Sequence, residues 1–75
     1  PYNYYKKNTV ICIEIKNLII KVGDHFAYRQ NDRWHKTRIV SIEENGQVLD
    51  ETSNGRYGIE VEKAIPNNVC LYLIQ

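Results

Sequence analysis

The fold of this chain is decided by the stretch Lys21-Val22-Gly23-Asp24-His25-Phe26-Ala27-Tyr28-Arg29, followed by Asn31-Asp32-Arg33-Trp34 and by Thr37-Arg38-Ile39-Val40-Ser41-Ile42. Gly23 and Asp24 predict a turn, because glycine adopts positive φ angles without steric cost. Phe26 and Tyr28 alternate with smaller or charged residues, which is typical of a strand with one buried face. The polar residues 31–33 predict a tight reversal into a second strand, so this stretch begins an antiparallel sheet.

The remaining strands are placed outward from this pair. Residues 9–16 are rich in β-branched side chains, which favour strands. Asn45-Gly46 predicts a hairpin, because both residues accept the positive φ angles of a type I′ turn. A second hairpin reversal is expected at 53–56. We expect six strands in all, at 9–16, 25–30, 34–42, 47–52, 57–62 and 69–74.

We expect the sheet to bend and to close into a barrel by pairing of its first and last strands. The alternation within 34–42 changes phase, which predicts a β-bulge or a strong bend near Arg38. Pairing of 9–16 with 69–74 would then complete a barrel. No stretch shows a helical period of useful length, so the sequence predicts an all-β fold, a small barrel of about five to six antiparallel strands. We expect one domain at 9–75, preceded by an N-terminal arm at 1–8, because a chain of 75 residues has too little volume for two cores.

The charge of the chain is close to zero, with ten basic and nine acidic side chains and a formal net charge of +1. This balance excludes a global field that would steer the whole molecule to nucleic acid or anionic lipid. The basic residues nevertheless gather in the window 29–38, whereas the acidic residues collect in the second half of the chain. Electrostatic recognition is therefore expected only at a local patch.

The two cysteines, Cys12 and Cys70, are too few for the disulfide framework of a small secreted domain. We expect both to be small buried hydrophobic residues, and the alternative is a disulfide between paired terminal strands. No apolar run reaches the length of a membrane span and no signal-peptide pattern is present. We therefore expect an intracellular protein, of the cytoplasm or nucleus, with no membrane partner. The start at Pro1 favours a processed chain or a domain of a larger protein.

Sequence motifs for catalysis are absent. No serine or cysteine lies beside a histidine and a carboxylate in the pattern of a nucleophilic triad. The cysteines and histidines show none of the close spacings of a zinc site. Every glycine lies in or beside an expected turn, so no glycine-rich phosphate loop follows a strand. The sequence thus predicts a protein that is not an enzyme, with no catalytic residue, no metal site and no cofactor.

The turn at 21–24, the reversal with Asp32 and Trp34, the run 37–42 and the hairpin at Asn54-Gly55 resemble the Tudor-type, SH3-like barrel. The resemblance extends from Lys21 to about Pro66 and implies a barrel with an added N-terminal strand. Tudor domains that bind methylated lysine or arginine use a cage of aromatic rings. The resemblance places the cage positions near Gln30, His35, Glu51 and Asn54. A shifted cage would use the neighbouring rings of Tyr28, Trp34 and Tyr57, with Glu51 or Asp50 as the anion.

A second resemblance is carried by the order strand, Tyr28-Arg29, short reversal, Trp34-His35-Lys36, strand and Asn-Gly hairpin. This order is similar to the SH3-like C-terminal DNA-binding domain of retroviral-type integrases and related transposases. The resemblance implies phosphate contacts from basic residues of the first two strands. Those residues here are Arg29, Arg33, Lys36 and Arg38, with Trp34 available to stack on a base or pack against sugar.

Two functions follow from these patterns. The first is a non-enzymatic binding module that recognises a peptide or protein partner in an aromatic-lined groove between the loops 31–34 and 53–57. Its expected ligand-binding residues are Tyr28, Trp34, His35, Glu51 and Tyr57. The alternative is a nucleic-acid-binding accessory domain that contacts DNA or RNA phosphates through Arg29, Arg33, Lys36 and Arg38. The small net charge favours the peptide. A homodimer formed through an exposed terminal strand is a third possibility.

Overall fold

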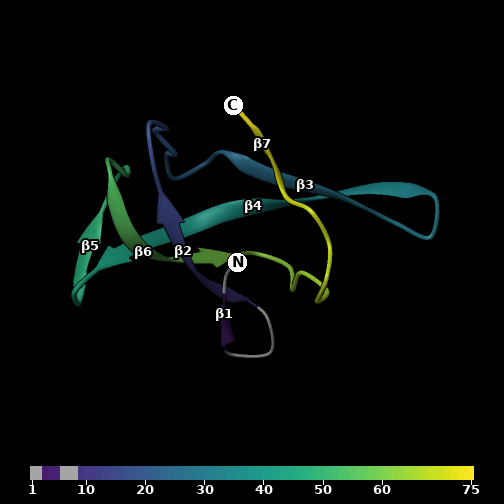
Figure 1. Ribbon diagram of the computed structural model, residues 1–75, viewed down its shortest axis with the longest axis horizontal. Coiled ribbons are helices and arrows are strands. Elements are labelled where there is room, and N and C mark those ends of the chain that lie inside the picture. The colour runs from purple at the N-terminus through teal and green to yellow at the C-terminus, as the bar shows by residue number, and fades with distance from the viewer. Residues whose placement is uncertain (1–2, 6–8) are drawn as a thin grey trace.

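Alternating apolar and polar residues build one curled antiparallel sheet, which forms a half-barrel in the computed structural model (Figure 1). The structure describes residues 3–5 and 9–75. The strands are β1 (Asn3–Tyr5), β2 (Val10–Ile15), β3 (His25–Gln30), β4 (Arg33–Glu44), β5 (Gln47–Leu49), β6 (Gly55–Val61) and β7 (Tyr72–Ile74). Their order is β1-β2-β6-β4-β3-β7, and β5 pairs with β4. The predicted all-β class is confirmed, with no helix among the described residues.

Two-residue loops turn the chain at both ends of β4. Asn31 and Asp32 have φ angles of 54° and 62° between the paired residues Gln30 and Arg33. Asn45 and Gly46 have φ angles of 52° and 80°, so the hairpin predicted there is confirmed. Positive φ at both central residues is the type I′ geometry, whose twist matches that of the flanking strands.

The long strand β4 bends so that it belongs to both halves of the sheet. Its first half pairs with β3, and its second half pairs with β5 and β6. The register to β6 shifts between Ile39 and Ser41, which confirms the predicted bulge, one to three residues beyond Arg38. An extra residue at a bulge bends a strand and increases its twist, which curls the sheet around its apolar face.

The apolar face of the curled sheet forms a single core. Tyr57, Ile59 and Val61 of β6 all face it, as their alternation predicts, and are at most 3% exposed. Isoleucine provides most of the fully buried side chains, and its β-branch suits a pleated surface. The buried core residues are Ile11, Ile15, Ile20, Phe26, Tyr28, Ile39, Ile42, Tyr57, Ile59, Val61 and Ile65.

The expected pairing of the two terminal strands is wrong. β2 pairs with β6, with Ile11 opposite Ile59, and β7 pairs with β3, with Leu73 opposite Phe26. No Cα atom of β2 lies within 8 Å of a Cα atom of β7, whereas paired strands are about 5 Å apart. The half-barrel therefore stays open along one side. We call this gap between β2 and β7 the seam.

The second hairpin expected at 53–56 is also wrong. Ile42 of β4 pairs with Leu49 of β5 on one side and with Ile59 of β6 on the other. The chain between β5 and β6 therefore crosses the end of β4 instead of reversing beside it. Buried Thr52 fixes this crossing, because its N–H donates to the Ile20 carbonyl at 2.9 Å and its hydroxyl accepts from the Ile20 N–H at 2.9 Å.

The cysteines are not the buried hydrophobic residues that we expected. Cys12 is half-buried, Cys70 is exposed, and both are free thiols. Cys12 lies on the face of β2 opposite the buried Ile11, and Cys70 lies just before β7, outside the core. Within the arm expected at 1–8, Asn3–Tyr5 form β1 along the first half of β2. Residues 1–2 and 6–8 of that arm lie outside the described residues.

Candidate functional site

Two of the aromatic rings expected to bind a ligand are structural. Tyr57 is 3% exposed, and its hydroxyl accepts a hydrogen bond from the Ser53 N–H at 2.8 Å. Tyr28 is 9% exposed and stacks on the ring of His35, its cross-strand partner, with centroids 5.2 Å apart. Both tyrosines point toward the core because they share the phase of the buried residues in β6 and β3. Neither ring is available as an anchor on the surface.

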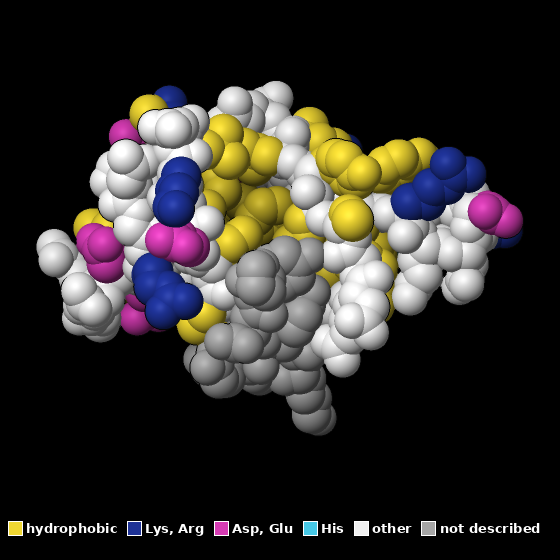
Figure 2. Space-filling model, in the orientation of Figure 1, with side chains coloured by type: hydrophobic (Ala, Val, Ile, Leu, Met, Phe, Trp, Pro, Cys, Tyr) yellow, Lys and Arg dark blue, Asp and Glu magenta, His cyan; other side chains and the backbone are white. Residues whose placement is uncertain are grey.

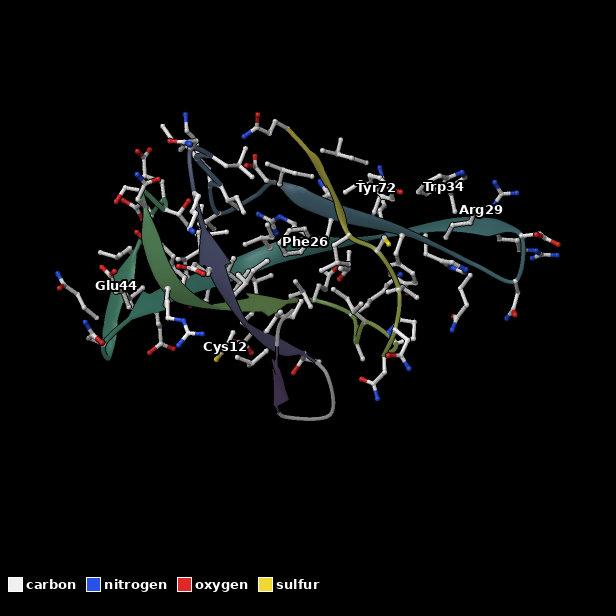
Figure 3. The ribbon with its side chains drawn as sticks, in the orientation of Figure 1. Cys12, Phe26, Arg29, Trp34, Glu44 and Tyr72 are labelled. Atoms are coloured by element: carbon white, nitrogen blue, oxygen red, sulfur yellow. The ribbon has the colours of Figure 1, made fainter. Side chains whose placement is uncertain are left out.

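The aromatic-lined groove expected between the loops 31–34 and 53–57 does not form. The first loop lies at the Arg33 end of β4, and the second lies beyond the Glu44 end, where β6 begins at Gly55. Figure 3 shows Trp34 and Glu44 at opposite ends of the molecule. Exposed Glu51 lies on the segment that crosses the end of β4, where its backbone forms an isolated antiparallel β-bridge with Lys21. Of the five expected ligand-binding residues, Tyr28 and His35 are stacked, but the five do not form one site.

The structure does bring together most of the residues expected to contact phosphate. The cross-strand pairs Arg29 with Trp34, Ala27 with Lys36, and His25 with Arg38 place these residues on one face of β3 and β4. The opposite face carries Phe26, Tyr28 and Thr37, which are buried in the core. We call the face that carries Arg29, Lys36 and Arg38 the outer face. Arg33, paired with Gln30, has the other phase and does not belong to it.

Tyr72 joins this outer face and was not expected there from the sequence. It pairs with Ala27, and its ring packs edge-to-face against that of Trp34, with centroids 5.6 Å apart and an interplanar angle of 68°. Trp34 and Tyr72 are 58% and 54% exposed, and Figure 3 shows them side by side with Arg29 nearby. Tyr72 alternates with the half-buried Leu71 and Leu73, and the pairing of β7 with β3 brings it to Trp34.

The charges of the outer face divide it into two halves. Arg29 and Lys36 lie beside the aromatic pair, and Arg38 lies further along β4. Glu62 lies next to Arg38, whose carbonyl accepts from the Glu62 N–H at 2.9 Å, and Glu60 is paired with Ser41 beyond the bulge. Arg29 lies 3.9 Å from the Asp32 carboxylate, with side-chain exposures of 58% and 100%. An ion pair as exposed as this one contributes little and leaves the guanidinium free to bind another anion. The cationic part of the outer face is therefore short and bounded by acidic side chains.

A second candidate site is an apolar groove along the seam, with a volume of about 540 Å³. One wall is residues 13–15 at the end of β2 with Lys16 just beyond it, and the other is Leu71 and Leu73 at β7, while Leu18, Ile20 and Phe26 complete the lining. Glu14 and Lys16 are the charged residues of this lining. Figure 2 shows the hydrophobic side chains at the bottom of this hollow, near the centre of the view. Its volume lies within the range of small-ligand sites.

The described residues contain no group of three or more histidine, cysteine or acidic side chains that would hold a metal ion. A search of the same residues finds no helix with the length and hydropathy of a membrane span. Comparison of the chain with known proteins finds no matching family model, no matching curated protein and no matching solved structure. The geometry of the outer face and of the seam groove is therefore the basis for any functional assignment.

Proposed function

We propose that this chain is a non-enzymatic module that binds single-stranded nucleic acid on its outer face. The observation that carries the proposal is the exposed Trp34–Tyr72 pair, which shares one face of the sheet with Arg29, Lys36 and Arg38. Exposed rings beside a short cationic track are the elements with which proteins bind single strands, because bases stack on the rings while phosphates meet the cations. A duplex hides its base faces, so it would use only the cations.

The size of the outer face limits the affinity. Trp34 and Arg38 are four residues apart on β4, which corresponds to about 13 Å along a strand. Such a length accommodates only a few nucleotides and about three phosphate contacts. The expected slope of log K against log salt is then about −2, because each single-strand contact contributes about −0.7. Weak binding with this modest salt dependence also agrees with the net charge of +1.

The experiment uses Trp34 as the probe, because it is the only tryptophan in the chain. We expect a thymidine oligonucleotide of about twelve residues to quench its fluorescence at low salt, since stacking on a base quenches indole emission. Tyr72→Ala should weaken binding about fivefold or more, given that stacking on one ring is worth about 1–3 kcal/mol. Competition with a duplex of the same length distinguishes stacking from simple phosphate attraction.

The matched control is charge reversal at two exposed basic residues of the outer face. Lys36 lies beside the aromatic pair, whereas Arg56 lies on β6, the strand that carries Glu60. The two variants are Lys36→Glu and Arg56→Glu. Only Lys36→Glu should weaken binding and flatten the salt slope. An unchanged Trp34 signal at low salt, tighter binding of the duplex, or equal loss in both variants would contradict the proposal.

The half-barrel is compatible with an SH3-like barrel, and we propose this finer assignment on the strength of its long bulged β4 and short hairpin loops. The groove between the loops 31–34 and 53–57, which the sequence predicted for a peptide, does not form. A peptide site is supported instead by the seam, and that site does not involve Trp34 or its neighbours on the outer face.

A further inference from the structure

We propose that the seam is a second binding site, which takes an extended peptide segment of a partner protein as an added β-strand. The sheet topology leads to this inference. Each neighbouring pair in the arc β2-β6-β4-β3-β7 is antiparallel, so its two edge strands run in the same direction. Direct pairing of β2 with β7 would therefore be parallel. A single strand between them would be antiparallel to both and would close the barrel.

The width of the seam agrees with one missing strand. Strands in a sheet are about 4.8 Å apart, so the neighbours on either side of one strand are about 10 Å apart. The Cα atoms of β2 and β7 are all more than 8 Å apart, yet side chains from both strands line the same groove. The gap is therefore too wide for direct pairing, and the two strands face each other across a single groove.

Backbone groups on the β2 wall are aimed at this gap. The Thr9 carbonyl accepts a hydrogen bond from the Val61 N–H at 2.8 Å, so alternate residues from Thr9 onward, including Ile13 and Ile15, turn their polar groups toward β6. Glu14 consequently turns its N–H and carbonyl toward the seam. β1 pairs with β2 only as far as Cys12, and no other described strand pairs with this edge. Edge groups that no described strand covers are a template for strand addition.

The lining of the groove determines the chemistry of the segment. Its buried floor residues Ile15, Ile20 and Phe26, and its half-buried wall residues Leu71 and Leu73, are all apolar. Side chains of a strand alternate between two faces, so an added strand would place every second side chain in the groove. The preferred segment thus carries valine-like or leucine-like residues at alternate positions and polar residues between them.

The length of the seam favours a short segment over a second copy of this chain. No described strand pairs with the β2 edge from Ile13 to its end at Ile15, which spans about 10 Å, or about three residues of an added strand. Such a segment buries on the order of 300 Å² per partner, against about 800 Å² per partner for a standard stable interface. The Gln75 side-chain amide, just after β7, donates to the Ile19 carbonyl, in the segment that follows β2, at 2.6 Å. The occupant is therefore a short linear segment bound transiently.

The test is an amide chemical-shift titration of the chain with a capped octapeptide that alternates valine with threonine and lysine. Two further octapeptides carry N-methyl groups at the odd or at the even positions, which removes the donors to one wall while keeping every side chain. We expect one-to-one binding of the unmodified peptide, with shifts at Glu14 and Leu73. Each N-methylated peptide should bind at least about tenfold more weakly, because each loses hydrogen bonds to one edge.

Two variants of the chain locate the same hydrogen bonds from the other side. Glu14→Pro removes the N–H aimed at the seam without removing a bond to β6, whereas Glu14→Ala keeps it. Only the proline variant should lose affinity. Should that variant fail to fold, the N-methylated peptides still test the proposal on the unaltered chain.

Four results would overturn the proposal. The first is absence of binding, and the second is equal binding of the N-methylated peptides. The third is concentration-dependent dimerisation that the octapeptide reverses, which would identify a second copy as the occupant. The fourth is binding only after residues 1–2 are deleted, which would assign the groove to this chain's own N-terminal residues.

Discussion

Replacement of Thr52 by valine tests how the crossing segment between β5 and β6 is held. Thr52 is 1% exposed, and its hydroxyl accepts from the Ile20 N–H at 2.9 Å and donates to the Leu18 carbonyl at 3.3 Å. Valine has the same shape but no hydroxyl, so the variant leaves the Ile20 N–H without an acceptor. Ile20 is itself 1% exposed, and water cannot replace the lost partner.

The magnitude follows from these burials. An unsatisfied buried donor costs about 1–3 kcal/mol. The Leu18 carbonyl belongs to a residue that is 43% exposed and can bond to water instead, so it adds little. We therefore expect Thr52→Val to lower the free energy of unfolding by about 1–3 kcal/mol. Thr52→Ser keeps the hydroxyl and loses one methyl group, which costs about 1 kcal/mol.

Urea unfolding followed by circular dichroism measures the global effect, and amide hydrogen exchange at Ile20 measures the local one. In Thr52→Val the Ile20 amide should exchange faster, whereas in Thr52→Ser it should keep its protection despite the lower stability. Peptide binding in the seam groove is a functional readout for Thr52→Val, because Leu18 and Ile20 line that groove. A loss of stability below about 0.5 kcal/mol, or unchanged protection of the Ile20 amide, would refute the assigned hydrogen bond.

Two further predictions concern residues at the start of β6. Tyr57→Phe removes the acceptor for the Ser53 N–H, which lies at 2.8 Å, and should cost about 1 kcal/mol in urea unfolding while leaving oligonucleotide binding unchanged; weaker binding would show that Tyr57 contacts ligand after all. Gly55 has a φ angle of 151°, and a Cβ atom there would lie 2.9 Å from the flexible Glu44 carboxylate. Gly55→Ala should therefore destabilise the chain by about 1–3 kcal/mol through backbone strain, and adding Glu44→Ala should restore little; full recovery would instead attribute the loss to the steric contact.

Features of the fold that depend on local backbone preference could be predicted from the sequence. The hairpin at Asn45-Gly46 follows from residues that accept positive φ, and the buried face of β6 follows from the alternation of Tyr57, Ile59 and Val61. The bulge in β4 was visible as a change of phase. Each of these features is set by a few consecutive residues, whatever the rest of the chain does.

Strand pairing could not be predicted in the same way. The alternation of residues 10–15 fits an edge beside β7 as well as it fits β6, because either neighbour would bury the same isoleucines. The crossing at 50–54 depends on Thr52 meeting Ile20, which is 32 positions away in the chain. These choices are decided by non-local packing, and no short pattern records them.

The candidate site was partly visible in the sequence for a related reason. The basic window 29–38 indicated where the cations would gather, but it did not show that Arg33 lies on a different face of the sheet from Arg29, Lys36 and Arg38. A two-residue loop at Asn31-Asp32 pairs Gln30 with Arg33 and so assigns Arg33 to the other face of the sheet. Tyr72 required the pairing of β7 with β3, which no local pattern showed.

The two proposed sites lie back to back on the same strands. In β3, Phe26 lines the groove while Ala27 lies on the outer face, and at β7, Leu73 lines the groove while Tyr72 packs against Trp34. Successive side chains of a strand point to opposite faces, so a substitution at one site leaves the side chains of the other in place. The proposals can therefore fail separately. A chain that binds the octapeptide but not the oligonucleotide would be a peptide module, and the reverse result would leave the seam as an unfilled edge.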